Sequence, residues 1–421
     1  MVLGTLSCKP NCSHTYLSLI LPIAALGILL IVVLFVLRLT VAAGTINGLL
    51  FYANIVQANH QTFLPTDTAN PLKHFYTIFL GWLNLDFGID TCFYNGMDTY
   101  VYSWLQFLFP VYLWILMFII ILSARYSQRV AHNLGQNPIA VLATVLLISY
   151  GKMLKAIIVP LSWAELQTIT PENSNISNHT DFVWLYNGNI RYSDHKHIAL
   201  VVVASLVLLF LFLPYSVLLL CGHWLQAKSH WRLLSWINKF KPFMDAYHAP
   251  YKKNSRHWIG VFLLARCGLF LTFALDATGL DDQHLNLLII ISVIAILSII
   301  KGRVYEKWYN DFLESSFLLN LCLLSVATIY VQSEKPSTDK PQDIIDNQVI
   351  VSTLSVGIAF IFFIGIMIFH TCQQIKELDL FGFFQSVHRS IKMVDKEHST
   401  ERISKSSVRL RELLLDDDTQ V

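Results

Sequence analysis

Two pairs of ionisable residues lie inside apolar stretches of the sequence, where a charge is costly. Asp86 and Asp90 are four residues apart, and Lys152 and Lys155 are three apart, so each pair shares one face of a helix. Ionisable groups within a membrane commonly pair with one another or line a path for ions. The opposite signs and the similar expected depth of the two pairs predict a charge cluster that either fixes helix packing or faces a water-filled ion path. The alternative is that Lys155 and Asp90 simply extend to the outer membrane interface.

A second group of charges lies toward the other side of the expected membrane. Arg266 interrupts the apolar run from Trp258 to Asp276, and Asp311 and Glu314 open a later apolar run. Their depths are compatible, so the sequence predicts an ion pair between Arg266 and one of the carboxylates. Such a pair would either hold two helices together or act as a gate that opens when it breaks.

The connection from Gly222 to His257 interleaves tryptophans with basic residues. This composition suits the headgroup zone of an anionic membrane leaflet, either as a passive collar or as a regulatory phosphoinositide site. The predicted lipid-contacting residues are Lys228, Arg232, Lys239, Lys241, Lys252, Lys253 and Arg256.

The end of the chain carries a short recognition pattern. Residues Thr419, Gln420 and Val421 have the form of a C-terminal strand that adds to the edge of a PDZ sheet. The sequence therefore predicts a PDZ scaffold as a partner of the tail.

Long apolar stretches must position these residues. The chain has 421 residues, of which 54% are hydrophobic and only 14% are charged. A helix of 22 residues is about 33 Å long, which matches the hydrocarbon core of a bilayer. We therefore predict an all-α, polytopic bundle of about nine transmembrane helices. They are Tyr16 to Leu37, Phe75 to Thr91, Val101 to Leu122, Ile139 to Pro160, Ile198 to Cys221, Trp258 to Asp276, Leu285 to Ile300, Phe312 to Val331 and Val349 to His370.

The predicted organisation has three parts: a short N-terminus (1–15), a transmembrane domain (16–370) and a polar tail (371–421). Within the domain, the segment 44–58 is interrupted by Gly, Asn and Gln, and Asn47 and Asn54 share one face. We predict an interfacial or re-entrant helix there. The alternative is that 44–58 spans the membrane and 75–91 is the re-entrant piece.

The charges of the connections orient the chain. Basic residues gather in the connection 222–257 and acidic residues in the loops on the opposite side, so the positive-inside rule places the N-terminus outside and the C-terminus in the cytosol of a plasma-membrane protein. Three N-glycosylation acceptor motifs agree, because all lie on the acidic side. Their asparagines are Asn11, Asn175 and Asn178.

Three stretches resemble an uncharacterised family of invertebrate multi-pass membrane proteins: Gly44 to Asn54, Trp82 to Tyr94 and Asp245 to Lys252. In that family the helical module often follows a Cys-rich or EGF-like ectodomain, and it is distantly similar to the membrane region of TRP-like proteins. This chain departs from the pattern, since only a short segment with Cys8 and Cys12 precedes its first apolar run. The resemblance implies cation conduction by analogy and brings no catalytic residues.

We therefore expect a TRP-like cation channel or a channel-related sensor. The alternatives are a receptor or adhesion-type protein that anchors and signals without conducting, and a transporter. The sequence has no nucleophile and base signature, no metal-ligand spacing and no phosphate-binding loop, so we expect no enzyme activity, metal or cofactor. Expected partners are membrane lipids, a PDZ scaffold and further copies of the chain, but not nucleic acid.

Overall fold

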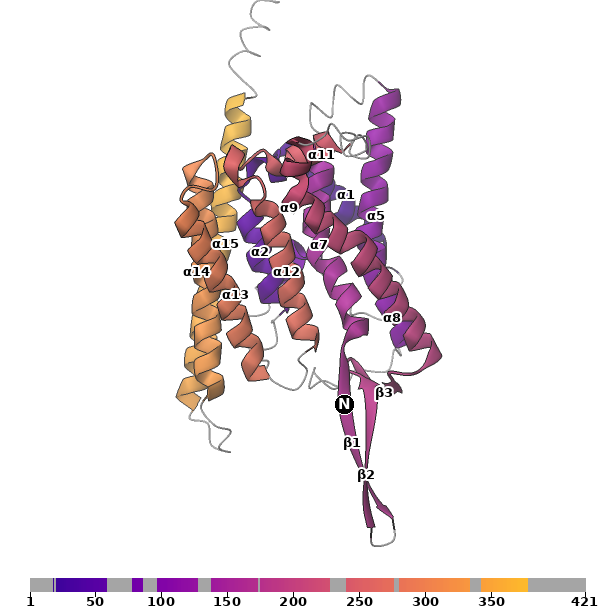
Figure 1. Cartoon of the computed structure of the whole chain (residues 1–421). Coiled ribbons are helices and arrows are strands. Elements are labelled where there is room, and N and C mark those ends of the chain that lie inside the picture. The colour runs from indigo at the N-terminus through magenta and orange to yellow at the C-terminus, as the bar shows by residue number, and fades with distance from the viewer. Residues whose placement is uncertain are drawn as a thin grey trace, which may run out of the picture. The chain divides into compact units, whose positions relative to one another are not determined.

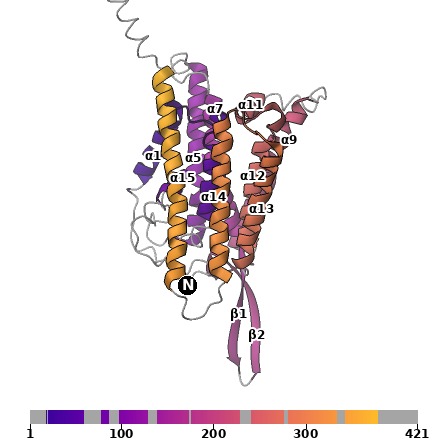
Figure 2. The same ribbon diagram turned by 90° about the vertical axis from the view of Figure 1, so that its left-hand side faces the viewer.

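The computed structural model describes residues 18, 20–58, 78–85, 97–127, 138–172, 175–227, 240–275, 280–333 and 342–377. It divides into two compact units, Met1–Ile366 and Met367–Val421. The arrangement given below is that of the first unit (Figures 1 and 2). The described residues of the second unit continue the last helix as far as Glu377.

The described residues are mostly helical, as the long apolar runs predict. Residues 78–83 are also helical, and a 3₁₀ turn, η2 (Val41–Ala43), precedes the second helix. The helices are α1 (Ile20–Val36), α2 (Asn47–Ala58), α5 (Thr99–Tyr126), α7 (Pro138–Leu161), α8 (His195–Val207), α9 (Leu213–Ala227), α11 (Lys241–His248), α12 (Trp258–Leu275), α13 (Leu280–Lys301), α14 (Trp308–Ser333) and α15 (Gln342–Glu377).

Six helical segments among the described residues are long and apolar enough to cross a membrane. A shorter apolar helix, Leu285–Lys301, accompanies them. Side chains such as Leu108 and Phe118 of α5 are 60% exposed, as suits a surface in contact with lipid. These features fit a membrane protein, whereas nine spans and the orientation of the termini remain predictions. The six segments are Ile20–Ala43, Thr99–Tyr126, Pro138–Leu161, His195–Gly222, Trp308–Tyr330 and Ile350–Gln373.

Helices α8 and α9 form one continuous helical segment that is interrupted by a π-helical turn. Between them lies a π-helical turn, η3 (Leu208–Phe212), in which the amide of Leu213 donates to the carbonyl of Leu208, five residues earlier. Pro214 follows at once and has no amide hydrogen to continue the regular ladder. The π turn is the local adjustment that such an interruption requires.

A three-stranded antiparallel sheet, which was not predicted from the sequence, accompanies the helices of this mostly helical chain. Its order is β1 (Trp163–Glu172), β2 (Asn175–Trp184) and β3 (Asn187–Arg191). The long hairpin β1–β2 pairs in register from Trp163 opposite Trp184 to Glu172 opposite Asn175. It extends beyond the helices at what we call the hairpin end, whereas α11 lies at the other end, the α11 end (Figures 1 and 2).

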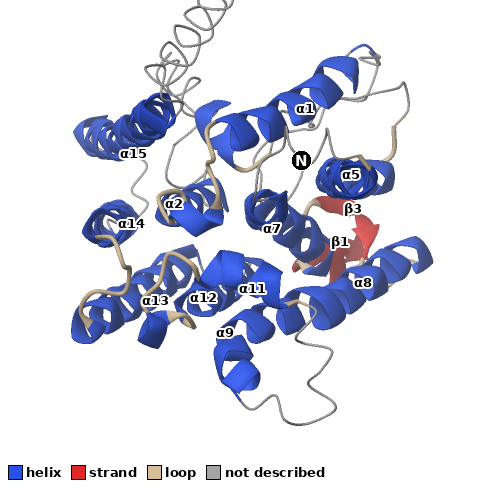
Figure 3. Ribbon diagram, turned by 90° about the horizontal axis from the view of Figure 1, so that it is seen from above, coloured by secondary structure: helices blue, strands red, loops and turns tan. Residues whose placement is uncertain are grey.

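Helices α2 and α7 lie inside the bundle. Every residue of α2 from Asn47 to Val56 is buried, and seen from above α2 is enclosed by α7, α12 and α14 (Figure 3). A helix lying on a membrane surface would keep one face in water, so the interfacial position predicted for 44–58 does not fit this burial. The choice between a re-entrant and a spanning segment remains a prediction.

Candidate functional site

Polar side chains gather along α2 in the middle of this apolar bundle. From Asn47 to Gln57 they extend over about 15 Å of helix, roughly half of a bilayer core. We call the group the α2 polar column. Its members are Asn47, Asn54 and Gln57 of α2; Asn84 of the segment 78–85; Lys152 and Lys155 of α7; and Arg266 of α12.

Two asparagines connect α2 to the segment 78–85. The Asn54 amide donates to Asn84 Oδ1 at 2.5 Å, and the Asn84 amide donates to the carbonyls of Ala53 at 2.9 Å and Leu80 at 2.8 Å. The Asn54 side chain lies against Gly151 of α7, where an added Cβ would be 2.5 Å from Asn54 Cγ. A glycine at 151 is therefore what lets α2 and α7 approach at this level.

The two predicted lysines lie beside these asparagines. Lys152 is 3% exposed and Lys155 is partly buried. Together with Asn54, Gln57 and Asn84 they line a small cavity. Their predicted partners, Asp86 and Asp90, lie outside the described residues, so the pairing of the two charge pairs stays a prediction.

Arg266 is fully enclosed at the other end of the column. Its side chain is 1% exposed, its Nη2 donates to the carbonyl of Asn47 at 3.4 Å, and its guanidinium lies 5.4 Å from the centre of the Phe51 ring. The Asn47 amide in turn donates to the Tyr251 hydroxyl at 3.4 Å. The hydrogen bond of Arg266 to Asn47 and its contact with the Phe51 ring place a buried positive charge directly against α2.

The carboxylates predicted to pair with Arg266 have other partners. Glu314 accepts hydrogen bonds from Trp258 Nε1 at 2.9 Å and from the Tyr305 hydroxyl at 2.5 Å. Asp311 Oδ1 accepts from the backbone amides of Val304 and Tyr305, both at 3.0 Å. The structure thus brings the three residues to one end of the bundle, but Arg266 bonds to the backbone of α2, and the carboxylates hold the connection that precedes α14.

Buried tyrosines complete this end of the site, and the sequence reasoning missed them. The Tyr251 and Tyr305 rings stack with centroids 4.7 Å apart, and their hydroxyls lie 3.3 Å apart. Burial, together with the nearby Glu314 carboxylate, raises the pKa of both phenols, so they remain neutral donors. The signal available in the sequence was the aromatic and proline pattern between Tyr247 and Tyr251, which was interpreted only as part of the connection and of the family resemblance.

Several buried polar atoms of the column have no hydrogen-bond partner among the described residues. They are Asn47 Oδ1, Asn54 Oδ1, and Nε and Nη1 of Arg266. A buried polar atom left unsatisfied costs about 1 to 3 kcal/mol, and native proteins usually satisfy such atoms with ordered water or an ion. Because two of these atoms lie on α2 and two on the adjacent Arg266, this column is the part of the described bundle that we consider best suited to hold water or ions.

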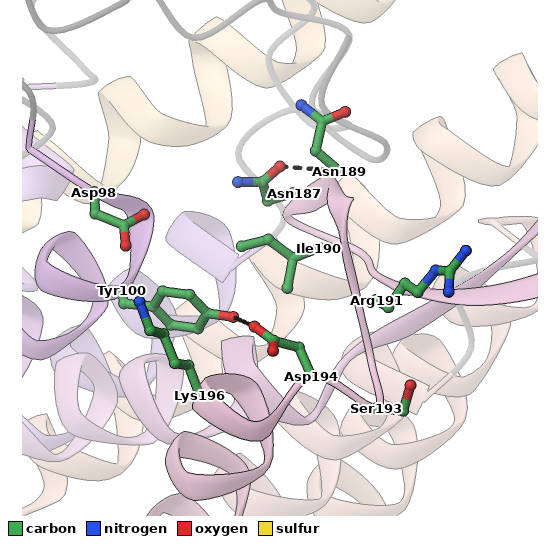
Figure 4. Close-up of a pocket in the computed structure, with 9 residues that line it drawn as sticks. All are labelled: Asp98, Tyr100, Asn187, Asn189, Ile190, Arg191, Ser193, Asp194 and Lys196. Carbon is green, nitrogen blue, oxygen red and sulfur yellow. Dashed lines mark hydrogen bonds between the residues drawn. The ribbon is translucent and has the colours of Figure 1, made fainter.

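A second, more open cavity of about 540 Å³ lies at the hairpin end (Figure 4). The starts of α5 and α8 and strand β3 form its walls. Asp98 and Asp194 precede these two helices, but neither side chain caps its own helix; Asp194 instead accepts a hydrogen bond from Tyr100 at 2.8 Å. The other lining residues are Asn187, Asn189, Ile190, Arg191, Ser193 and Lys196.

The remaining predicted sites are only partly described. Asn175 and Asn178 lie on β2, next to the tip of the hairpin. Lys241, Lys252, Lys253 and Arg256 lie at the α11 end of the bundle. Other predicted residues lie outside the described part of the chain, namely Asn11, Lys228, Arg232, Lys239, Thr419, Gln420 and Val421.

No family model, no curated protein and no solved structure matches this chain.

Proposed function

We propose that the protein is a polytopic membrane protein of the channel class, and that its ion path follows the α2 polar column. The observation that carries this proposal is the pair of buried, unsatisfied Oδ1 atoms of Asn47 and Asn54 on α2, with the unsatisfied Nε and Nη1 of Arg266 beside Asn47 and the buried Lys152 beside Asn54. An apolar bundle gains nothing in stability from such atoms. They become favourable when water or ions reach them, which is the usual reason for polar groups at membrane depth.

The shape of α2 supports the same function. Its 12 residues make a helix of about 18 Å, too short to cross a bilayer alone. Helices that end within a membrane are tolerated where other protein segments bury them or where they line a hydrated cavity. Helix α2 is buried by other protein segments, since α7, α12 and α14 enclose it. Its asparagines are suited to line a hydrated cavity.

The broader expectations belong to this proposal. The α11 end would face the cytosol and the hairpin end the outside of the plasma membrane, so that glycans on Asn175 and Asn178 would be extracellular. The resemblance to TRP-like proteins favours cations as the conducted ions. On this account Asp86 and Asp90 supply negative charge to the path, and nine helices cross the membrane.

Replacing Lys152 by methionine tests the path. The change removes a buried positive charge that repels cations in the path, while methionine keeps the length of the side chain. We expect the ratio of cation to anion permeability to rise roughly tenfold, which corresponds to about 1.4 kcal/mol. The measurement is the reversal potential of whole-cell currents at matched surface abundance.

Ser325→Ala is the matched control, because Ser325 is buried in α14 and its hydroxyl donates to Leu321 of the same helix. Its permeability ratio should equal that of the wild type. An unchanged ratio in Lys152→Met would contradict the proposed path. If surface protein gives no current under voltage, calcium or lipid stimuli, the receptor alternative is favoured, and the cavity between Asp98 and Asp194 becomes the ligand site to examine.

A further inference from the structure

Two connections that are distant in sequence lie side by side at the α11 end. The Lys252 amide donates to the carbonyl of Val304, and the Glu306 amide donates to the carbonyl of Pro250, both at 3.0 Å. Between these bonds Tyr251 and Tyr305 form an antiparallel bridge. The segment that links α11 to α12 and the segment that links α13 to α14 therefore form one surface.

This shared surface is strongly basic. We call it the basic collar: Lys252, Lys253, Arg256, Lys301, Arg303 and Lys307. Within 249–257 and 301–308 the one acidic residue is Glu306. Lys253, Lys301, Arg303 and Lys307 are exposed, and Arg256 Nε has no hydrogen-bond partner among the described residues. The collar thus combines charges from both connections, whereas the lipid-contacting residues predicted from the sequence all lie in the first.

Exposed tryptophans place the collar at the level of a membrane surface. Trp308 is 64% exposed and begins a candidate span, and Trp224, 63% exposed, follows the end of another. The Trp224 ring stacks on His257 at 6.4 Å, and His257 Nε2 lies 2.5 Å from Lys301 Nζ at the end of α13. Tryptophans favour the boundary between hydrocarbon and headgroups, so the neighbouring basic groups lie at the depth of lipid phosphates.

We propose that the basic collar binds the phosphate groups of anionic lipid headgroups, with phosphoinositides as the most highly charged members of that class. Arginines match phosphate oxygens with two parallel hydrogen bonds, and lysines add point charge. An acidic soluble partner would gain nothing from tryptophans that border the hydrocarbon, so the lipid source is favoured. This inference is independent of the proposed ion path.

The test measures lipid binding to the purified full chain by native mass spectrometry. The probes are short-chain phosphatidylinositol bisphosphate, phosphatidylserine, phosphatidylcholine and soluble inositol trisphosphate. We expect both anionic lipids to bind more tightly than phosphatidylcholine, with the phosphoinositide first. The double change Arg303→Gln with Lys307→Gln should weaken phosphoinositide binding about 30-fold, because each basic residue near an anionic surface contributes roughly fivefold.

The control is Arg191→Gln with Lys196→Gln, which removes the same charge at the hairpin end. It should leave binding unchanged, and thermal unfolding establishes that both double variants fold. Three results would overturn the inference: equal binding of anionic and zwitterionic lipids, equal loss in the two double variants, or binding of the soluble inositol phosphate as tight as that of the lipid, which would assign the collar to a free phosphate compound.

Discussion

Replacing Gly260 by alanine should destabilise the protein by about 3 kcal/mol, the upper part of the usual range for overpacking. A Cβ at position 260 of α12 would lie 2.4 Å from both the backbone nitrogen and Cα of Leu220 in α9. Real Cβ atoms do not approach backbone so closely, and a backbone segment inside a helix cannot rotate away as a side chain can. The two helices must therefore separate, and a lower thermal unfolding temperature of purified protein would report it.

Gly268→Ala provides the matched control in the same helix. Among the described residues, a Cβ at position 268 meets no atom within 4 Å outside its own stretch of helix, so the change should be neutral or stabilise α12 by up to about 1 kcal/mol through helix propensity. Equal unfolding temperatures for the two variants would contradict the close packing of α9 on α12.

Replacing Glu314 by alanine should lower the free energy of unfolding by about 2 to 4 kcal/mol. The carboxylate is 3% exposed and accepts from both Trp258 and Tyr305. Its removal leaves the buried Trp258 donor without a partner, at about 1 to 3 kcal/mol, and takes from the Tyr305 hydroxyl its charged acceptor, so that this hydroxyl is left with the Tyr251 hydroxyl at 3.3 Å. The relief of burying a charge offsets part of this loss. Thermal unfolding of the purified variant measures the change.

Glu314→Gln separates hydrogen bonding from charge. Its amide oxygen can accept the Trp258 hydrogen bond, so we expect a smaller loss than for alanine. Alanine and glutamine variants that unfold together, or an alanine variant as stable as the wild type, would show that the Trp258 and Tyr305 bonds do not hold this end of the bundle together.

Apolar length was enough to predict most of the helices. The runs beginning near Val101 and Ile139 correspond to α5 and α7 within a few residues, because a long apolar stretch has few alternatives to a helix in a membrane protein. The β1–β2 hairpin was missed because it does not depend on a long apolar stretch. Its stability comes from ten facing backbone pairs and from the anchoring of Trp184, whose Nε1 donates to the carbonyl of Val159, and neither contact is visible as an apolar pattern.

The site was harder to predict than the fold. Arg266 was recognised as a costly buried charge, but depth alone suggested a carboxylate partner, whereas the structure supplies the backbone of Asn47 and the ring of Phe51. Asn47 and Asn54 were recognised as sharing one face of a helix, and the mixed composition of 44–58 was interpreted as an interfacial or re-entrant helix, with a spanning helix as the alternative. Tertiary contacts with Tyr251 and Asn84 bury this face instead.

The most direct test of the ion path is flux through the purified full chain in liposomes that contain anionic lipid. Preloaded liposomes report the release of radioactive sodium, potassium and chloride. We expect release faster than from protein-free liposomes, and a higher ratio of cation to chloride release for Lys152→Met than for the wild type. The proposed ion path would be contradicted if ion release were no faster than from protein-free liposomes, provided that the purified protein unfolds cooperatively and retains bound lipid.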